Sequence, residues 1–428
     1  MPASARLRSA LVAAVALVAA RAAGSETLDE VLAAARAANA RLPVAQADVA
    51  IGSEAVREAR AALGPRVSVG GDVRYAPGPA SYSPAVAPIS EERLQLLADQ
   101  PLYDGGALRA RIDASAAQLR AARARYRVAE RDLDLEVRAR YAEALAVEAE
   151  LASRRQGLER LRSYLSLVRE RMAAGQGLEA DRLRTEVRLS DGEANVSDAE
   201  RRLAGAKLEL NDLMGRDPRA ALDLAPLPAP SPPAPSSEEP WLAAPDLLQA
   251  EADREAAVAG IAEARAARAL HLDLTLDAGI FGPGFPFPGA APSVPARLRD
   301  DLGVSLTLSF SWAFWDFGAS GARLAQARLK ARQAEGSLVV MRRQARLEWE
   351  RAEADLAALY RTVEIRAAAV PAARDSYVLA ESLYRGGLGT SLEVLDAYAA
   401  LVDAEISHAT AVQQYRVAAA QAARWGAP

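Results

Sequence analysis

The amino-acid sequence contains two copies of one long pattern, and this internal repeat limits the folds open to the chain. In the first copy, Tyr103-Asp104-Gly105-Gly106 precedes a long helical stretch that breaks at Gly175-Gln176-Gly177. In the second copy, Trp315-Asp316-Phe317-Gly318 precedes a stretch that breaks at Gly387-Leu388-Gly389. The aspartate lies 71 residues before the first glycine of the break in both copies, so both landmarks are displaced by 212 residues. Such regular self-similarity predicts one structural unit built twice.

A proline- and serine-rich segment, LAPLPAPSPPAPSSEEP, separates the two copies and is typical of an extended linker. The predicted division is a first repeat over 24–223, this linker over 224–240 and a second repeat over 241–428. Each repeat is expected to begin with a helix.

Residues 1–23 have the pattern of a secretory signal peptide. Arg6 and Arg8 precede an apolar run, and Ala20-Arg21-Ala22 forms a small-residue cleavage site. The alternative is an N-terminal helix of a cytosolic protein. Beyond this segment no stretch of about 18 apolar residues occurs, so the sequence predicts no transmembrane helix in the mature chain.

Composition excludes several classes of function. Hydrophobic residues make up 51% of the chain but aromatic residues only 5%, which suits long, closely packed helices better than thick globular cores. The net charge is −4 with no block of one sign, so we expect no nucleic-acid partner. The absence of cysteine excludes disulfides, cysteine catalysis and a lipid-modified N-terminal cysteine. His271 and His408 show no metal-ligand spacing, so we predict no metal site, no cofactor and no enzymatic activity.

Four segments alternate polar and apolar residues with a period of two, which predicts β-strands. The predicted strands are 66–75, 93–101, 271–281 and 302–312. Each is about 9–11 residues long, the length at which a tilted strand crosses a bilayer, although a soluble sheet with one wet face gives the same alternation. Proline- and glycine-rich loops at 76–92 and 282–297 join the strands in pairs, and such loops belong outside hydrocarbon.

The last strand has an apolar face that we expect to contact lipid. Its predicted lipid-facing residues are Leu302, Val304, Leu306, Leu308, Phe310 and Trp312. Rings at Tyr75, Phe281, Trp312 and Trp315 would fall at strand ends, where an interfacial aromatic belt forms. Four strands cannot close a membrane barrel, which needs about eight, so the barrel must be shared between two or three chains.

Long helices account for the rest of each repeat. The sequence predicts a long helix over 107–172 with a return helix over 178–214, and a second such pair over 319–384 and 391–425. Apolar residues recur at steps of three and four along the first long helix, which contains no proline. Its 66 residues would extend roughly 100 Å.

Together these features resemble the TolC-like outer membrane efflux protein family, also called outer membrane factors. The matching segments are LYDGG at 102–106, RMAAGQGLEADRLRTEVRLSDGEA, LYRGGLGTSLEVLDAYAALVDAE and the closing helix to Arg424-Trp425-Gly426. The chain departs from the family at WDFG, where a glycine pair is more usual, and at His271, where a proline is common. We interpret both departures as loop and junction variation.

The resemblance implies a mainly α fold with a small β part. Long α-helical hairpins would form a periplasmic α-barrel, and four strands per chain would join a shared trimeric 12-stranded outer-membrane β-barrel. This homotrimer would lie in outer-membrane lipid, extend into the periplasm and serve as the passive exit duct of a tripartite efflux or type I secretion system. It would dock to a periplasmic adaptor protein and, through it, to an inner-membrane transporter. The alternative is a soluble periplasmic coiled-coil scaffold or adaptor.

The resemblance also assigns an aperture gate to the hairpin tips. Glu393 and Asp396 match an acidic ring that would favour cations, while Asp181 and Tyr384 match a polar contact that holds the entrance closed. An arginine used in some relatives for the same contact is here Gly389. The alternatives are a capping box of Glu393 with Thr390, an acidic group near a helix N-terminus for Asp396, and a solvated helix face for Asp181.

The same tips are implied to meet the adaptor. The predicted docking residues are Gly175, Gly177, Leu178, Gly387, Leu388 and Gly389. Glycine is also what two sharp helix reversals require, and the two roles can coexist.

Overall fold

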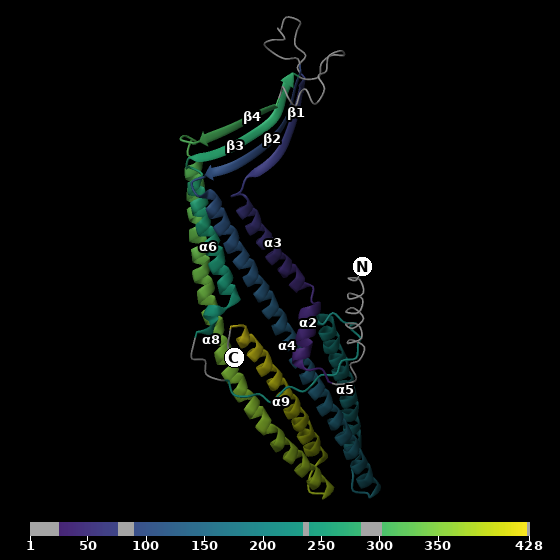
Figure 1. Cartoon of the computed structure of the whole chain (residues 1–428). Helices are drawn as coiled ribbons and strands as arrows, with labels where there is room; N and C mark the ends of the chain where they lie inside the picture. The colour runs from purple at the N-terminus through teal and green to yellow at the C-terminus, as the bar shows by residue number, and fades with distance from the viewer. Residues whose placement is uncertain (1–24, 76–89, 234–238, 284–301, 426–428) are drawn as a thin grey trace, which may run out of the picture. The chain divides into compact units, whose positions relative to one another are not determined.

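The computed structural model describes residues 25–75, 90–233, 239–283 and 302–425 (Figure 1). The predicted signal peptide at 1–23, most of the loops at 76–92 and 282–297, and part of the linker lie outside these residues. None of the helices within the described ranges is both long and apolar enough to cross a bilayer.

The chain divides into two compact units that differ from the two predicted repeats. The first unit comprises Met1–Val44, Arg127–Ala244 and Arg343–Pro428, and the second comprises Ala45–Tyr126 and Pro245–Arg342. Each unit therefore combines corresponding pieces of both repeats. This follows because a single repeat cannot bury its apolar faces alone, so its long helix packs against the other copy.

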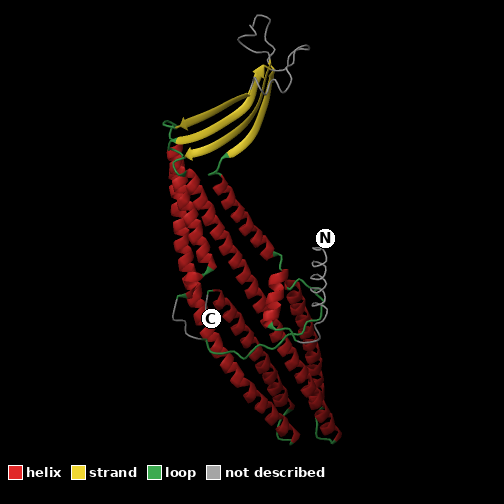
Figure 2. Ribbon diagram, viewed as in Figure 1, coloured by secondary structure: helices red, strands yellow, loops and turns green. Residues whose placement is uncertain are grey.

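The second unit contains one antiparallel sheet in the order β1-β2-β3-β4 (Figure 2). Its strands are β1 (Arg66–Tyr75), β2 (Ser90–Tyr103), β3 (His271–Pro283) and β4 (Leu302–Ser311). β2 and β3 are longer than the predicted strands 93–101 and 271–281. Main-chain pairing continues to Glu91 opposite Pro283, although the alternation of polar and apolar residues in the sequence has ended there. In contrast, β4 ends one residue before Trp312.

The strand register gives the sheet two chemically different faces. Val69, Leu96, Ala278 and Val304 pair directly across all four strands, so they share one apolar face. Arg66, Asp99, Thr275 and Thr307 form a corresponding polar row on the other face, where Thr275 Oγ1 donates a hydrogen bond of 2.8 Å to Asp99 Oδ1. The alternation predicted from the sequence is confirmed.

Helices complete the second unit. α3 (Arg41–Ala61) lies beside the first part of α4 (Ala107–Ala173) (Figure 1). α6 (Pro245–Ala266) lies beside the first part of α8 (Ala319–Arg385). A side chain at Gly52 of α3 would lie 3.3 Å from Leu119 of α4, which shows how closely these two helices approach. An ion pair of 3.3 Å between Arg342 and Glu251 joins α8 to α6.

The first unit is helical, and its described helices bury two large apolar clusters, besides a smaller one that contains Val363. α2 (Leu28–Ala38) and α5 (Glu179–Leu213) pack with α4 in one cluster, around Val137 and Leu210. α9 (Ser391–Arg424) packs with α4 and α8 in the other, which contains Tyr164 and Tyr384. The observed helices differ from the predicted 107–172, 178–214, 319–384 and 391–425 by one residue at an end or at both ends. η1 (Pro240–Ala243) is a short 3₁₀ turn before α6.

The linker between the repeats is held against this unit. Leu224 makes a parallel bridge with Glu26, and the Tyr415 hydroxyl donates a hydrogen bond of 2.6 Å to the Ser231 carbonyl. The described part of the linker is therefore extended but fixed by side chains of the helices.

Candidate functional site

The two helical hairpins reverse direction through the same backbone turn. Gly175 (φ 73°) and Gly387 (φ 78°) follow α4 and α8 in the left-handed conformation. Their amides donate to the carbonyls of Met172 (2.9 Å) and Tyr384 (3.0 Å), which is the hydrogen-bond pattern of a glycine that ends a helix. The break predicted at the same place in each repeat is thus one geometry built twice.

A second glycine in each tip is required by close packing. A Cβ at Gly177 would lie 2.8 Å from the backbone nitrogen of Met172, and one at Gly389 would lie 3.1 Å from Leu383 Cβ. Beside these glycines the side chains of Leu178 and Leu388 are exposed, the latter by 82%. Each tip therefore presents one apolar side chain on a glycine turn, and docking of the adaptor there stays a prediction.

The structure brings Asp181 and Tyr384 together. Asp181 lies in the first turn of α5 and is only 9% exposed, while Tyr384 near the end of α8 is 3% exposed. The Tyr384 hydroxyl donates a long hydrogen bond of 3.5 Å to Asp181 Oδ2. Thr185 is fully buried beside them and donates a bond of 2.7 Å to the Asp181 carbonyl. The alternative of a solvated helix face for Asp181 is wrong, because this carboxylate is packed between two hairpins.

Burial favours the protonated form of the two tyrosines in this contact. Desolvation and the neighbouring Asp181 carboxylate raise the pKa of Tyr384, and desolvation raises that of Tyr164, whose ring centroid lies 5.3 Å from that of Tyr384. Both hydroxyls therefore keep their protons well above neutral pH. Tyr384 is a hydrogen-bond donor to Asp181 throughout that range.

Arg171 is a member of this site that the sequence analysis missed. Its guanidinium lies over the Tyr384 ring, 4.7 Å from the centroid, and Nη1 donates a hydrogen bond to the Tyr384 carbonyl. The sequence feature that could have revealed it is its position three residues after the buried Val168, which places a charged residue on the apolar face of the long helix. The resemblance places an arginine for this contact at the position of Gly389, but in this chain Arg171 makes a contact with Tyr384 instead.

Glu393 and Asp396 lie in the first two turns of α9 and are both exposed. Glu393 Oε2 accepts a hydrogen bond of 2.8 Å from the Thr390 amide, and Thr390 Oγ1 accepts one of 3.3 Å from the Glu393 amide. This capping box was the alternative role for Glu393, and it leaves the carboxylate at the surface. Asp396 has no hydrogen bond or ion pair within the described residues, so its charge faces solvent.

A protein-family profile matches most of the chain. The profile of the family described as "Outer membrane efflux protein" matches residues 31–216 and 242–424. The chain belongs to the outer membrane efflux protein family. It is therefore an outer-membrane efflux channel that extends into the periplasm, and not an enzyme. The resemblance inferred from the hairpin and turn segments is confirmed.

Solved channel structures share the fold of this outer membrane efflux protein. OprN is 23% identical, with a TM-score of 0.82 over 94% of this chain and 90% of its own. VceC from Vibrio cholerae is 18% identical, with a TM-score of 0.81 over 94% and 96%. The open state of MtrE from Neisseria gonorrhoeae is 21% identical, with a TM-score of 0.80 over 93% and 88%. No curated protein sequence matches the chain.

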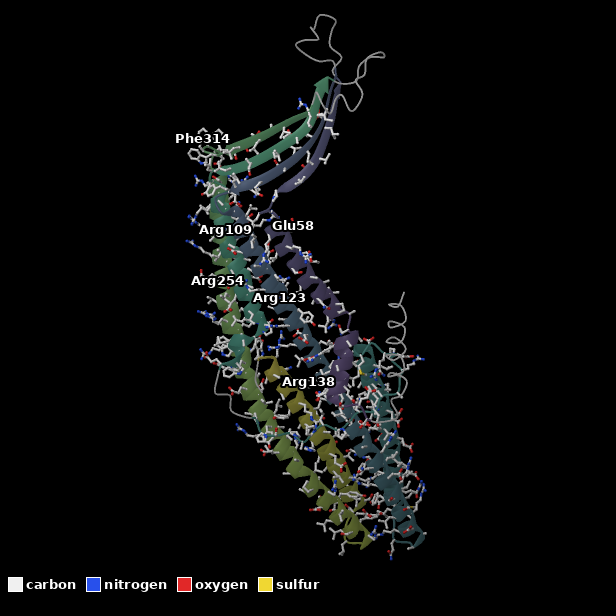
Figure 3. All side chains as sticks on the ribbon, viewed as in Figure 1. Glu58, Arg109, Arg123, Arg138, Arg254 and Phe314 are labelled. Carbon is white, nitrogen blue, oxygen red and sulfur yellow. The ribbon has the colours of Figure 1, made fainter. Side chains whose placement is uncertain are left out.

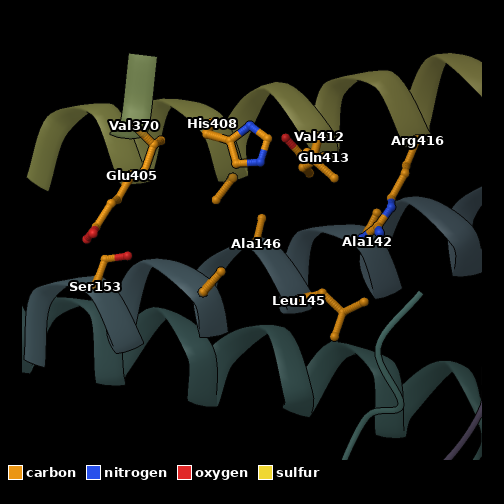
Figure 4. Close-up of a pocket in the computed structure, with 12 residues that line it drawn as sticks. Ala142, Leu145, Ala146, Ser153, Val370, Glu405, His408, Val412, Gln413 and Arg416 are labelled. Atoms are coloured by element: carbon orange, nitrogen blue, oxygen red, sulfur yellow. The ribbon is translucent and has the colours of Figure 1, made fainter. Parts of the chain in front are cut away.

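A groove of about 340 Å³ lies between α4 and α9 of this efflux protein, with Val370 of α8 at its rim (Figure 4). Small side chains of α4 line one wall, and Glu405, His408 and Arg416 line the other. Glu405 is paired with Arg160 at 3.5 Å. Among the described residues no three metal-ligating side chains lie together, so this histidine has no ligand set around it.

Proposed function

We propose that three copies of this chain form the exit duct of a tripartite efflux or type I secretion system. The observation that carries this proposal is the four-stranded sheet with one apolar face and two edge strands, β1 and β4. Within the described residues each edge strand pairs on one side only. An open edge is not viable in lipid and about eight strands are the minimum for a barrel, so twelve strands from three copies meet both requirements.

Each copy would also supply two helical hairpins to a periplasmic α-barrel. The 67-residue helices α4 and α8 and the return helices α5 and α9 provide the walls. A passive duct needs a lumen, a constriction and a docking surface, and it needs no nucleophile or acid–base pair. Family membership and the sheet favour this function over the soluble scaffold or adaptor.

The constriction would lie at the hairpin tips. In a trimer, Glu393 and Asp396 would place six carboxylates around one axis, and this ring would favour cations. Asp181, Tyr384 and Arg171 would hold the two tips of each copy together and keep the aperture narrow. Opening would require these buried contacts to break.

The same tips would receive the periplasmic adaptor. Leu178 and Leu388 are exposed apolar side chains on glycine turns, and an adaptor hairpin with a small apolar notch would fit them. The adaptor would connect the duct to an inner-membrane transporter, which would supply the substrate and the energy.

The aperture ring is tested by the single-channel conductance of the purified protein in planar bilayers. Asp396→Ala is expected to lower the preference for cations over anions and the sensitivity of the current to divalent ions. Asp191→Ala, which removes an exposed carboxylate of α5 away from the tips, is the matched control and should conduct like the parent. Unchanged ion selectivity in Asp396→Ala would refute the acidic ring at the aperture. A protein that stays monomeric and soluble without detergent would refute the proposed exit duct.

A further inference from the structure

The groove between α4 and α9 contains a carboxylate oxygen that no described residue satisfies. Glu405 lines the groove from α9, and its side chain is only 10% exposed. The Oε2 atom of this side chain is buried and has no hydrogen-bond partner among the described residues. A buried carboxylate oxygen without a donor is costly, so this atom marks a position where a donor is expected.

Two arginines lie near Glu405 but leave this oxygen available. Arg160 of α4 and Arg374 of α8 both approach the other oxygen, Oε1, at 3.5 and 3.6 Å. Hydrogen bonds from a guanidinium to a carboxylate are about 2.7–2.9 Å long, so both ion pairs are loose. The Arg374 side chain is also 58% exposed, and solvent therefore screens its charge. Oε2 of Glu405 can accept a hydrogen bond from a further donor.

Two more polar side chains line the same part of the groove. The Glu405 side chain extends from α9 toward Ser153 of α4 (Figure 4). His408 follows Glu405 by three residues, which places both side chains on one face of α9. Its Nδ1 atom is buried and likewise has no partner in the described part of the chain. A carboxylate, a hydroxyl and a ring nitrogen of neutral histidine can all accept hydrogen bonds, so this end of the groove suits a donor with several hydrogens.

The rest of the groove is mostly apolar. The wall of α4 consists there of small and aliphatic side chains, and the wall of α9 includes two more: Ala142, Leu145 and Ala146 on α4, and Ala409 and Val412 on α9. The volume of about 340 Å³ is within the range of roughly 300–1,000 Å³ that is typical of pockets for drug-sized ligands. The groove therefore fits an apolar body that carries one strong hydrogen-bond donor.

The basic side chains nearby do not make this groove an anion site. Arg416 lines the opposite end, where its Nη2 already donates to the carbonyls of Leu227 (3.2 Å) and Pro228 (3.1 Å). Arg138 of α4, labelled in Figure 3, lines the adjoining hollow beside the linker and not this groove. Arg160, whose buried Nη1 has no partner among the described residues, is not part of the groove lining either. The unsatisfied atoms that line the groove favour a cationic donor.

We propose that the groove between α4 and α9 binds an amphipathic organic amine. The ammonium group donates to Glu405 Oε2 and to the acceptors of Ser153 and His408, and the apolar body lies along the alanine wall of α4. The bound amine joins the two helical hairpins, because α4 belongs to the first hairpin and α9 to the second. This site goes beyond the proposed duct and does not depend on it, since one copy of the chain forms the whole groove.

Binding is tested with a thiol in the groove, because the chain has no cysteine. The rate at which methyl methanethiosulfonate modifies Ala409→Cys is measured in detergent with 4-phenylbutylamine, 4-phenylbutanol or 4-phenylbutyrate. These probes share one apolar body and differ in the polar group. We expect the amine to protect the thiol at a concentration at least about tenfold below that of the alcohol, because only the amine pairs its charge with Glu405. Ser166→Cys, at an exposed position of α4, should react at the same rate with every probe.

Two further substitutions in the Ala409→Cys chain separate the charge from the shape of the groove. Glu405→Gln removes the charge with little change in size and should abolish protection by the amine. Ala146→Leu leaves Glu405 in place but fills the apolar wall, so it should abolish protection without lowering Tm. If Glu405→Gln prevents folding, Ala146→Leu decides alone. Asp403→Asn, which removes an exposed carboxylate of α9 two residues before Glu405, is the matched control and should be protected like the parent.

Each outcome either supports or overturns the amine site. Protection by the amine that is lost in Glu405→Gln and Ala146→Leu supports it, and protection that persists in both overturns it. Stronger protection by 4-phenylbutyrate would assign the groove to an anion, and protection by no probe would show that it holds water only. A thiol that is unreactive without any probe would show that another copy or segment covers the groove. The last three results overturn the amine site and leave the exit duct standing, because conductance tests the duct.

Discussion

The guanidinium of Arg171 lies over the ring of Tyr384, 4.7 Å from its centroid, and caps the carbonyl of the same residue. The two residues are 213 positions apart and belong to different hairpins. The carbonyl that Arg171 reaches also accepts the amide of Gly387, so the cation sits at the C-terminal end of α8, where the helix dipole favours positive charge. One side chain thus joins the end of the first hairpin to the turn of the second.

Arg171→Ala is expected to loosen the hairpin tips. It removes a charged hydrogen bond and a cation–π contact, which together contribute about 2 kcal/mol. We expect a lower Tm and a larger single-channel conductance, because the contact that keeps the two tips together is lost. Arg171→Lys retains the charge but not the planar stacking and should give an intermediate conductance.

The matched control for this prediction is Arg169→Ala. Arg169 lies two residues away on α4 and forms an exposed pair of 3.1 Å with Glu186, which contributes at most about 1 kcal/mol. If both variants changed conductance equally, general charge loss would explain the effect and the role of Arg171 would be refuted.

Replacing glycine by alanine should change stability in opposite directions at a left-handed turn position and inside a helix. Gly387→Ala places a side chain at φ 78°, and we expect it to destabilise the protein by about 1 kcal/mol. Gly336→Ala lies within α8, where an added Cβ meets nothing within 4 Å, so it should stabilise by about 0.5–1 kcal/mol. Chemical denaturation measures both changes, and a shift of the same sign in the two variants would contradict the assignment of the turn.

The sequence could predict those parts of the structure that depend on local signals. Strand faces follow from alternation, and helix ends follow from Gly175 and Gly387, whose conformation is set by neighbours within five residues. Arg171 could not be placed, because its contact requires α4 and α8 to lie side by side. Phe317 adopts a left-handed conformation (φ 52°) that the sequence could not predict either, since phenylalanine itself gives no sign of it. The roles of Glu393 and Asp396 stay predictions, because an axis shared by several copies is needed to test them.

The protein should become less stable in acid, because protonation of Glu150 in α4 weakens its ion pairs. Burial alone would raise the pKa of this carboxyl, but hydrogen bonds from Arg202 (2.6 Å) and Arg154 (2.7 Å) outweigh burial and hold the pKa below its usual 4.5. Because the folded pKa is the lower one, the stabilisation is complete above about pH 4.5 and is lost as the pH falls further. Thermal unfolding between pH 7 and 3 measures it.

Glu150→Gln should flatten this dependence and cost about 1–2 kcal/mol at neutral pH. Glu159→Gln, in an exposed pair with Arg162, is the control and should leave the acid dependence of Tm unchanged. An undiminished acid dependence in Glu150→Gln would assign the effect to other carboxylates.

The linker between the repeats should come loose when its tyrosine contacts are removed. The Tyr141 side chain is fully buried, and its hydroxyl lies 2.6 Å from the Ala225 carbonyl and 2.9 Å from that of Glu26. Tyr141→Phe leaves these part-buried carbonyls without this donor, so we expect a loss of about 1–2 kcal/mol and faster proteolysis between Ala225 and Ser231. Tyr126→Phe, at a half-buried tyrosine of the same helix, should change neither by a measurable amount. Equal cleavage of the two variants would show that the linker is held by its proline-rich backbone and not by the hydroxyl of Tyr141.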